Sequence, residues 1–256
     1  MAYTVAFAGK GGTGKTTVTG MMVDWLCSHG KGPVLAVDAD ANSNLNEVLG
    51  VEVETTLGDI REIIAESDMD DNTPIPASMT KKEYLDYKFN SALVEDDDFD
   101  LLVMGRTQGK GCYCFVNDLL SAQLRKLKDK YRYMLVDNEA GMEHISRGVL
   151  PSVDLIILVS DCSRRGIQAV GRIKELCGEM KLGQERIALI VNRAPNGELN
   201  EGIKEEIAKY GLDLVGVVPQ DQAVYEYDCA GTPTSTLPGD SAARKAVNEI
   251  AEKLFA

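Results

Sequence analysis

A glycine-rich run near the start of the chain has the composition and spacing of a phosphate-binding loop. Residues 9–17 read GKGGTGKTT, and Gly9, Gly14, Lys15 and Thr16 match the pattern G-x-x-x-x-G-K-[ST]. Glycines allow the backbone to curl so that its N–H groups surround a phosphate chain, and a helix that begins there adds its positive end. The chemistry expected here is the binding of a phosphate chain.

The residues on either side give this run the strand–loop–helix context that the pattern requires. Apolar residues 5–8 precede it, and residues 18–26 have the pattern of a helix. The Lys15 ammonium can reach the terminal phosphates, and the Thr16 hydroxyl can bind Mg²⁺. The expected binding residues of the loop are Gly11, Gly12, Thr13, Gly14, Lys15 and Thr16.

Aspartates that follow two expected strands supply the carboxylates that such a site needs. Ligands of open α/β sheets bind beyond the carboxyl ends of the strands. Asp137 ends an apolar strand, where a carboxylate needs a cation, and a Mg²⁺ shell would provide one, usually through water. Asp40 is placed to orient an attacking water, and Gly141 can bring a backbone N–H close to the γ-phosphate. The alternative for each aspartate is a helix cap or a loop residue.

Asn192 ends another expected strand and has two possible roles. Its amide carries both a donor and an acceptor, so it can read the edge of an adenine base. Asparagine is also common in turns, where its side chain bonds to the backbone.

A Cys-x-Cys pair, Cys112 and Cys114, is the second feature that could do chemistry. Two thiolates separated by one residue can bind one soft metal ion such as Zn²⁺ or Ni²⁺, but they give only half of a tetrahedral set. A twofold dimer would complete the set. The alternative is that both side chains pack in the core. Packing is the default expectation for the other cysteines, which are Cys27, Cys162, Cys177 and Cys229.

Apolar strands alternate with helical stretches along the chain. This alternation predicts an α/β fold with a single doubly wound, mostly parallel sheet and helices on both faces, in one domain over residues 1–256. The expected strands are 3–8, 34–38, 101–105, 133–137, 155–160, 187–192 and 214–218. The expected helices are 16–28, 45–49, 116–130, 167–177, 199–210 and 242–254.

One acidic segment, at about residues 65–100, interrupts this alternation. It contains Pro74 and Pro76 and many aspartates, and we expect an irregular excursion with a short helix near 81–89. The excursion is either a solvated surface or a flap that binds a partner or attracts cations.

The composition indicates a globular protein of strongly acidic character. The chain has 256 residues, 44% of them hydrophobic, and a formal net charge of -13. Acidity of this degree argues against non-specific binding to nucleic acid or an anionic membrane. The expected helix at 242–254 has the mixed charges of a core-packing helix. The chain opens into a strand and has no apolar run of spanning length, so we expect a cytoplasmic location.

The phosphate loop contains a second lysine, Lys10, directly after its first glycine. This loop resembles the deviant Walker A loop of the MinD, ParA and nitrogenase iron-protein superfamily of ATPases. In that superfamily the extra lysine crosses a dimer interface, so the resemblance implies a homodimer that encloses two ATP molecules. It also implies catalytic roles for Lys10 and Lys15 and a position near the α-phosphate for Thr17.

By the same match, Asp40 falls on the catalytic switch I aspartate, and Asp137 and Gly141 fall on the switch II motif. The switch II segment reads DNEAG where some members have DMGAG. Glu139 therefore adds a carboxylate close to the nucleotide, and its effect on hydrolysis is open.

Two further stretches narrow the resemblance. The Cys-x-Cys pair, with residues 139–144 (EAGMEH) and 147–148 (RG), resembles the CooC/AcsF group of nickel-insertion ATPases. This group serves carbon monoxide dehydrogenase and acetyl-CoA synthase, and the similarity covers essentially the whole chain. His144 is either a helix residue at the dimer face or an auxiliary metal ligand.

The resemblance thus implies an ATP-dependent maturation factor, or metallochaperone, that acts as a homodimer. ATP with Mg²⁺ would close the dimer, the paired cysteines would bind Zn²⁺ or Ni²⁺, and the client would be a nickel–iron–sulfur enzyme. Two alternatives use the same loop: a MinD/ParA-type positioning ATPase, and an iron-protein-like electron-transfer ATPase with an iron–sulfur cluster. The acidic charge and the cysteine pair favour the maturation factor, with no nucleic-acid or membrane partner.

Overall fold

One eight-stranded sheet organises the computed structural model, which describes residues 1–69, 76, 78–106, 113–141, 149–150, 152–179 and 186–256. The strand order is β3-β4-β2-β5-β1-β6-β7-β8, and only the β3–β4 pair is antiparallel. The strands are β1 (Tyr3–Ala8), β2 (Val34–Ala39), β3 (Leu93–Glu95), β4 (Phe99–Val103), β5 (Tyr133–Asn138), β6 (Leu155–Asp161), β7 (Arg186–Ala194) and β8 (Leu214–Pro219). The predicted fold class is confirmed.

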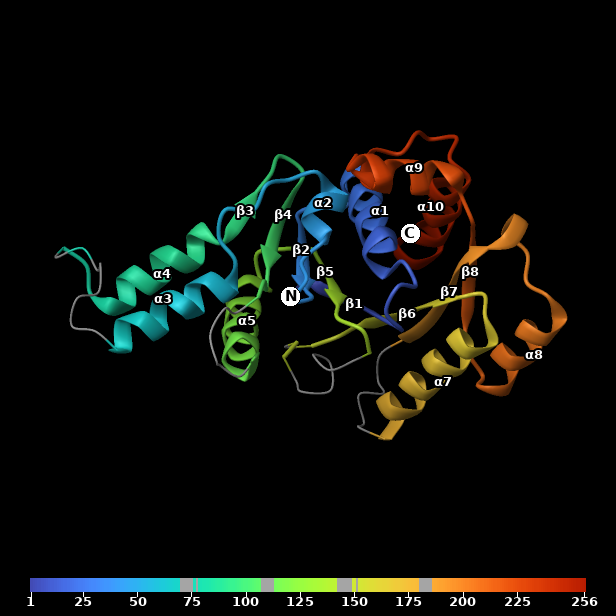
Figure 1. Ribbon diagram of the computed structural model, residues 1–256, viewed down its shortest axis with the longest axis horizontal. Helices are drawn as coiled ribbons and strands as arrows, with labels where there is room; N and C mark the ends of the chain where they lie inside the picture. The colour runs from blue at the N-terminus through green and yellow to red at the C-terminus, as the bar shows by residue number, and fades with distance from the viewer. Residues whose placement is uncertain (70–75, 77, 107–112, 142–148, 151, 180–185) are drawn as a thin grey trace.

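Helices cover both faces of this sheet (Figure 1). The α-helices are α1 (Lys15–Ser28), α2 (Leu45–Leu49), α3 (Leu57–Met69), α4 (Lys81–Ser91), α5 (Tyr113–Leu127), α7 (Arg164–Glu179), α8 (Glu201–Lys209), α9 (Gln222–Ala230) and α10 (Ala242–Phe255). Short 3-10 helices lie at η1 (Pro195–Gly197) and η2 (Thr234–Thr236). Side chains of α1, α2 and α10 pack on one face, and those of α3, α5, α7 and α8 pack on the other.

The central strands are buried on both faces, as their continuous apolar runs predict. In β1 all residues from Thr4 to Ala8 are buried, and every residue of β2 is buried. The pairing of β2 with β5 places Asp38 beside Asp137 at the carboxyl edge of the sheet. Strand β5 is also the direct neighbour of β1, which leads into the phosphate loop. The sheet therefore brings the two candidate carboxylate segments and the phosphate loop to one edge.

The acidic segment carries more regular structure than the sequence suggested. The predicted short helix is present as α4, and Thr80 and Glu83 form a capping box at its start. Strand β3 pairs with β4 and so joins the segment to the edge of the sheet. Strand β3 has only three residues, so its sequence carries no clear alternation of apolar and polar residues. It forms because its backbone pairs with β4. Figure 1 shows α3 and α4 side by side, extending beyond the sheet.

The last helix packs in the core, as predicted. Val247, Ile250, Ala251 and Phe255 of α10 are all buried against the α1 side of the sheet. The apolar face of α10 is therefore already covered by protein.

Across the ranges that the structure describes, no helix has both the length and the apolar character needed to cross a membrane.

Candidate functional site

The phosphate loop connects the end of β1 to the start of α1. Gly9 comes so close to β6 that a Cβ there would lie 2.2 Å from the carbonyl oxygen of Val159. Gly14 has φ +86°, in the left-handed region, and a Cβ there would lie 2.4 Å from Nδ2 of Asn192. Both glycines are therefore required by the tertiary structure around the loop as well as by its curvature.

Lys15 is folded back over the loop. Its side chain is buried, and Nζ lies 3.4 Å from the carbonyl oxygens of both Gly9 and Lys10. Burial lowers the pKa of this ammonium, and the negative charges of Asp137, Asp40 and, less strongly, Glu139 act against that shift. A phosphate chain in the loop would accept strong, charge-assisted hydrogen bonds from the Lys15 ammonium.

Asp137 is an almost fully buried carboxylate beneath the loop. Its exposed fraction is 2%, and its Oδ1 atom has no hydrogen-bond partner among the described residues. The pKa of Asp137 is raised to about 7, mainly by burial and also by the charge of Asp38, while a hydrogen bond with Thr16 and the charge of Lys15 act against the rise. An unpaired buried carboxylate oxygen beside a threonine hydroxyl fits a hydrated Mg²⁺ ion.

Asp38 is a buried carboxylate beside the candidate site that the sequence reasoning did not select. It is fully buried, and its carboxylate accepts hydrogen bonds from the backbone N–H of Asp40 at 3.0 Å and of Leu45 at 2.9 Å. Burial raises its pKa to about 6, against the lowering effect of these hydrogen bonds. Asp38 therefore fixes the turn that carries Asp40. Its signal in the sequence was a carboxylate at the end of an otherwise apolar strand.

The turn after β2 holds Asp40 at the rim of the site. Its Oδ1 accepts a hydrogen bond from the N–H of Asn42 at 2.8 Å, and Asn42 also contacts the guanidinium of Arg106. Asp40 is half-buried and lines the same cavity as the loop. The Asp40 carboxylate has further acceptor positions that can bind a water molecule, as its predicted role requires.

Gly141 is already bonded to the phosphate loop. Its N–H donates to the carbonyl oxygen of Gly9 at 3.0 Å. This bond forms an isolated β-bridge between the loop and the residues that follow β5. The predicted contact of this N–H with a γ-phosphate stays a prediction, and it requires that bond to open.

Two adjoining cavities lie over the carboxyl edge. The first, here called the phosphate cavity, has about 570 Å³ and is lined by the loop, by Asp40 and Glu139, and on the opposite side by Asp228, Gly231, Thr232 and Thr234. The second, here called the base cavity, has about 560 Å³ and lies between α1, β7, β8, α9 and α10. The residues that line both cavities are Thr17, Arg193 and Asp228.

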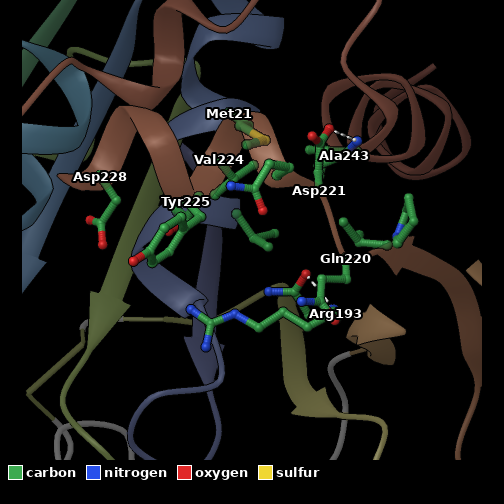
Figure 2. Close-up of a pocket in the computed structure, with 15 residues that line it drawn as sticks. Met21, Arg193, Gln220, Asp221, Val224, Tyr225, Asp228 and Ala243 are labelled. Carbon is green, nitrogen blue, oxygen red and sulfur yellow. Dashed lines mark hydrogen bonds between the residues drawn. The ribbon is translucent and has the colours of Figure 1, made fainter. Parts of the chain in front are cut away.

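The base cavity combines apolar walls with a few polar groups (Figure 2). Met21 and Val224 lie toward one end and Arg193 toward the other, with Tyr225 and Asp228 of α9 along one side. A flat apolar base and a polar sugar would suit this arrangement. The sequence reasoning did not find α9, because its nine residues bury no side chain completely and give no apolar stripe.

Asn192 lines the base cavity, but both of its polar atoms already have protein partners. Nδ2 donates to the carbonyl oxygen of Thr13 at 2.9 Å, and Oδ1 accepts from the N–H of Arg193 at 2.9 Å. Each atom keeps one further hydrogen-bonding position, so a base contact stays a prediction. Arg193, which was not predicted, donates to the carbonyl oxygen of Gly12 at 3.1 Å and so also holds the loop.

The predicted metal ligands are only partly covered by the structure. Cys112 lies outside the described residues, and so do His144 and its neighbours in the range 142–148. The structure describes the backbone of Cys114 in the first turn of α5, which begins at Tyr113. Within the described ranges there is no group of three or more metal-binding side chains. The Cys-x-Cys metal site stays a prediction.

The fold and the two cavities define the class of protein: a P-loop nucleotide-binding protein with a mostly parallel sheet. Residues 4–234 match the family described as the CobQ/CobB/MinD/ParA nucleotide binding domain, and the chain belongs to that family as a nucleotide-binding ATPase. The predicted superfamily and ATPase class are confirmed.

Several relatives extend this comparison. An uncharacterised ATP-binding protein of Methanocaldococcus jannaschii is 42% identical over 98% of both chains. The carbon monoxide dehydrogenase accessory protein CooC of Rhodospirillum rubrum is 31% identical over 89% of this chain and 87% of its own length. The solved structure of the septum site-determining protein MinD of Pyrococcus horikoshii, complexed with Mg-ADP, has a TM-score of 0.73 at 23% identity, covering 100% of this chain and 96% of that one.

Proposed function

We propose that this ATPase is a maturation factor that assists nickel insertion into a carbon monoxide dehydrogenase or an acetyl-CoA synthase. The observation that carries the proposal is the similarity to CooC along most of both chains, together with the Cys112-Tyr113-Cys114 motif. Nickel is then cargo, and the two thiolates are the side chains of suitable softness to hold it or Zn²⁺.

ATP binds across the two cavities in this proposal. The base lies among the apolar side chains of the base cavity, and the triphosphate passes Thr17 and Arg193 to reach the loop. The loop N–H groups and the Lys15 ammonium then hold the phosphates. The volume of each cavity, about 560 and 570 Å³, is within the usual range for a ligand pocket.

Mg²⁺ has a place beside these phosphates. The Thr16 hydroxyl and the unpaired Oδ1 of Asp137 would hold the ion, directly and through water. The ion would neutralise charge on the phosphates during their cleavage. Asp40, held by the buried Asp38, orients the attacking water.

A homodimer is the third part of the proposal. Lys10 is exposed at the tip of the loop, as a lysine that reaches a partner's nucleotide must be. Twofold symmetry would bring two Cys112/Cys114 pairs together and complete a four-thiolate site. Because coupling between sites is reciprocal, metal that favours the closed dimer must also strengthen ATP binding.

Sedimentation and metal content test the proposal together. We expect the wild-type chain to become a dimer with one Zn²⁺ or Ni²⁺ per two chains when ATP is present, measured anaerobically by analytical ultracentrifugation with metal analysis. Cys112→Ser with Cys114→Ser should lose the metal and the metal-linked dimer but keep ATP binding. Cys229→Ser, which removes an exposed thiol of α9, is the matched control and should behave as wild type.

Normal metal stoichiometry in the double variant would contradict the site. A wild-type chain that stays monomeric with every combination of ATP and metal would contradict the maturation factor as a whole. A brown protein with iron and sulfide after anaerobic purification would instead favour the iron-protein-like alternative.

The positioning ATPase is the competing function, because the fold is shared with MinD. In this chain the apolar face of α10 is buried in the core, so this helix offers no apolar face to a lipid surface. Co-sedimentation with anionic vesicles or with DNA in the presence of ATP would support the competing function, and its absence is the expected result.

A further inference from the structure

The wall of the phosphate cavity that faces the loop is formed by the chain between α9 and α10. Gly231, Thr232 and Thr234 line the cavity from this side. Its local hydrogen bonds, such as Thr232 N–H to Tyr227 and Thr236 N–H to Pro233, stay within the segment or reach back to α9. These bonds shape the segment but do not attach it to the phosphate-binding helix α1.

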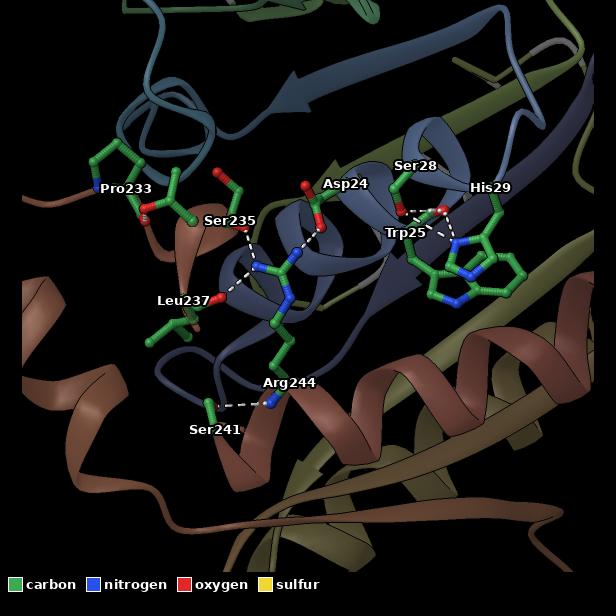
Figure 3. A network of polar contacts seen from close by, with 10 residues as sticks. Asp24, Trp25, Ser28, His29, Pro233, Ser235, Leu237, Ser241 and Arg244 are labelled. Atoms are coloured by element: carbon green, nitrogen blue, oxygen red, sulfur yellow. Dashed lines mark hydrogen bonds and ion pairs between the residues drawn. The ribbon is translucent and has the colours of Figure 1, made fainter. Parts of the chain in front are cut away.

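Arg244 of α10 makes the hydrogen-bonded attachment (Figure 3), beside the apolar packing of Leu237 in the cluster that contains the α1 side chains. Its Nη1 atom donates to the carbonyl oxygens of Ser235 and Leu237, at 2.6 Å each. Its Nη2 atom donates to the carboxylate of Asp24 on α1. One planar guanidinium therefore connects the cavity wall to the helix that begins with Lys15.

The same network reaches the base cavity through the first turn of α10. The Ser241 hydroxyl accepts from the Arg244 N–H at 3.2 Å and donates to Asp221 Oδ2 at 2.7 Å. Asp221 also accepts from the N–H of Ala223, which caps α9, and it lines the base cavity. The ion pair thus lies at one end of a chain of hydrogen bonds whose other end borders the base cavity.

A purely structural role for the pair is the alternative, and the packing of α10 counts against it. Helix α10 is already anchored by Val247, Ile250 and Phe255, which are buried against the α1 side of the sheet. What the guanidinium adds is the connection from α1 to the two carbonyl groups of the loop. Arg244 and Asp24 are 19% and 32% exposed, so solvent screens the pair less than a fully exposed one.

We propose that Arg244 and Asp24 are positioning residues for the nucleotide, which hold residues 231–237 against α1 so that Thr232 and Thr234 close the phosphate cavity. The proposal rests on the placement of the triphosphate in that cavity. Lysine at position 244 keeps the charge but cannot donate to both carbonyl groups and the carboxylate in the same plane.

Calorimetric titration with Mg-ATP and Mg-ADP tests this role. We expect Arg244→Lys to weaken the affinity for both nucleotides by about tenfold, as the partial loss of charged hydrogen bonds predicts. Arg164→Lys is the matched control: Arg164 pairs with Glu206 at 3.1 Å between α7 and α8, and neither residue is among those that line the phosphate cavity or the base cavity. This control should change nucleotide affinity by less than about twofold, even if it lowers stability.

A double-mutant cycle shows whether the two residues act together. Asp24→Asn should weaken nucleotide binding, and the variant with both changes should bind no more weakly than Arg244→Lys alone. Amide hydrogen exchange gives a local measure, because Thr236 and Leu237 should exchange faster in Arg244→Lys while the amides of the last turns of α10 stay protected.

Three results would overturn the inference. These are nucleotide affinity within twofold of wild type in a folded Arg244→Lys protein, additive effects of the two changes, and equally faster exchange along all of α10. A wild-type protein that binds no nucleotide would instead contradict the placement of the triphosphate itself, so the two failures are distinguishable.

Discussion

The two walls of the phosphate cavity are held in different ways. The loop wall is fixed where its glycines meet other strands, since Gly9 lies against the Val159 carbonyl and accepts from the Gly141 N–H, and the side chains of Asn192 and Arg193 add hydrogen bonds to it. The opposite wall continues into residues 235–237, where the guanidinium of Arg244 and the buried side chain of Leu237 attach it to the α1 side of the sheet. A glycine packed against a carbonyl oxygen tolerates no side chain, whereas a side-chain attachment can weaken by degrees. The loop wall is therefore suited to holding the phosphates in a fixed position. The position of the opposite wall can be changed gradually by substitutions that weaken its attachment.

The largest effect is expected from Gly14→Ala in the loop wall. A left-handed backbone costs an alanine about 1–2 kcal/mol, and the new Cβ would displace Asn192, whose amide holds Thr13. We expect ATP affinity, measured by calorimetry, to fall by about a hundredfold or more, since both the strain and the displaced amide distort the loop.

Gly30→Ala is the matched control for this change. Gly30 has φ +63° and open space around it, at the far end of α1. It should show the strain alone, as a stability loss of about 1 kcal/mol with unchanged ATP affinity. Near-normal ATP binding by Gly14→Ala would show that the loop wall is less rigid than proposed.

An intermediate effect is expected from pH through Asp137. Its folded pKa of about 7 lies above the value of about 3.9 for an unfolded aspartate. Between these values the folded state holds a proton that the unfolded state has released, so the free energy of unfolding falls as pH rises from about 4 to about 7. Without nucleotide, the protein should be more stable at pH 5 than at pH 8, by an amount of order 1 kcal/mol.

Asp137→Asn isolates this contribution, because asparagine does not titrate. Measured by denaturant unfolding, the free energy of unfolding should change less steeply with pH in the variant than in the wild type. The pH dependence that remains is due in part to Asp38, whose pKa is about 6. We expect the Mg²⁺-dependent ATP affinity of the wild type to rise with pH up to about pH 7, as Asp137 loses its proton, and the variant should lack this rise. An unchanged slope would mean that Asp137 is charged in the folded protein throughout.

The smallest effect is expected from Thr234→Val in the opposite wall. Thr234 is buried, and its hydroxyl has no hydrogen-bond partner among the described residues. Removing it should leave the nucleotide-free protein as stable or up to about 1 kcal/mol more stable, and weaken ATP binding about two- to threefold. Denaturant unfolding and calorimetry measure the two quantities.

Thr19→Val provides the contrast, since the Thr19 hydroxyl does have a partner, the Lys15 carbonyl at 3.0 Å, and lines neither cavity. It should lower stability and leave ATP affinity unchanged. A loss of stability in Thr234→Val equal to that in Thr19→Val would show that the Thr234 hydroxyl is satisfied in solution.

Much of the fold could be predicted because its signals are local. Every strand except β3 contains an apolar run and was found within a few residues. Helices α3 and α9 and strand β3 were missed, since α9 has no fully buried side chain and β3 exists through pairing with β4. Patterns of apolar residues predict only elements that bury a face of their own.

The site divides in the same way. Lys15, Thr16 and Asp137 could be chosen from the sequence because a phosphate loop and a carboxylate at the end of an apolar strand are recognisable without a structure. Arg193, Asp228 and Thr232 could not, because each reaches the cavity from an element whose position depends on the rest of the sheet.

The sequence alone determined the chemistry of the loop: its glycines, its buried lysine and its threonine specify a curled backbone that binds phosphate, because those constraints act over neighbouring residues. Only the tertiary structure decided what faces that loop. Arg244 and Asp24 are 220 residues apart in the chain, and their contact exists because α1 and α10 pack on the same face of one sheet. A contact between residues so far apart in the chain depends on how all the helices and strands pack together. No local sequence pattern can predict it.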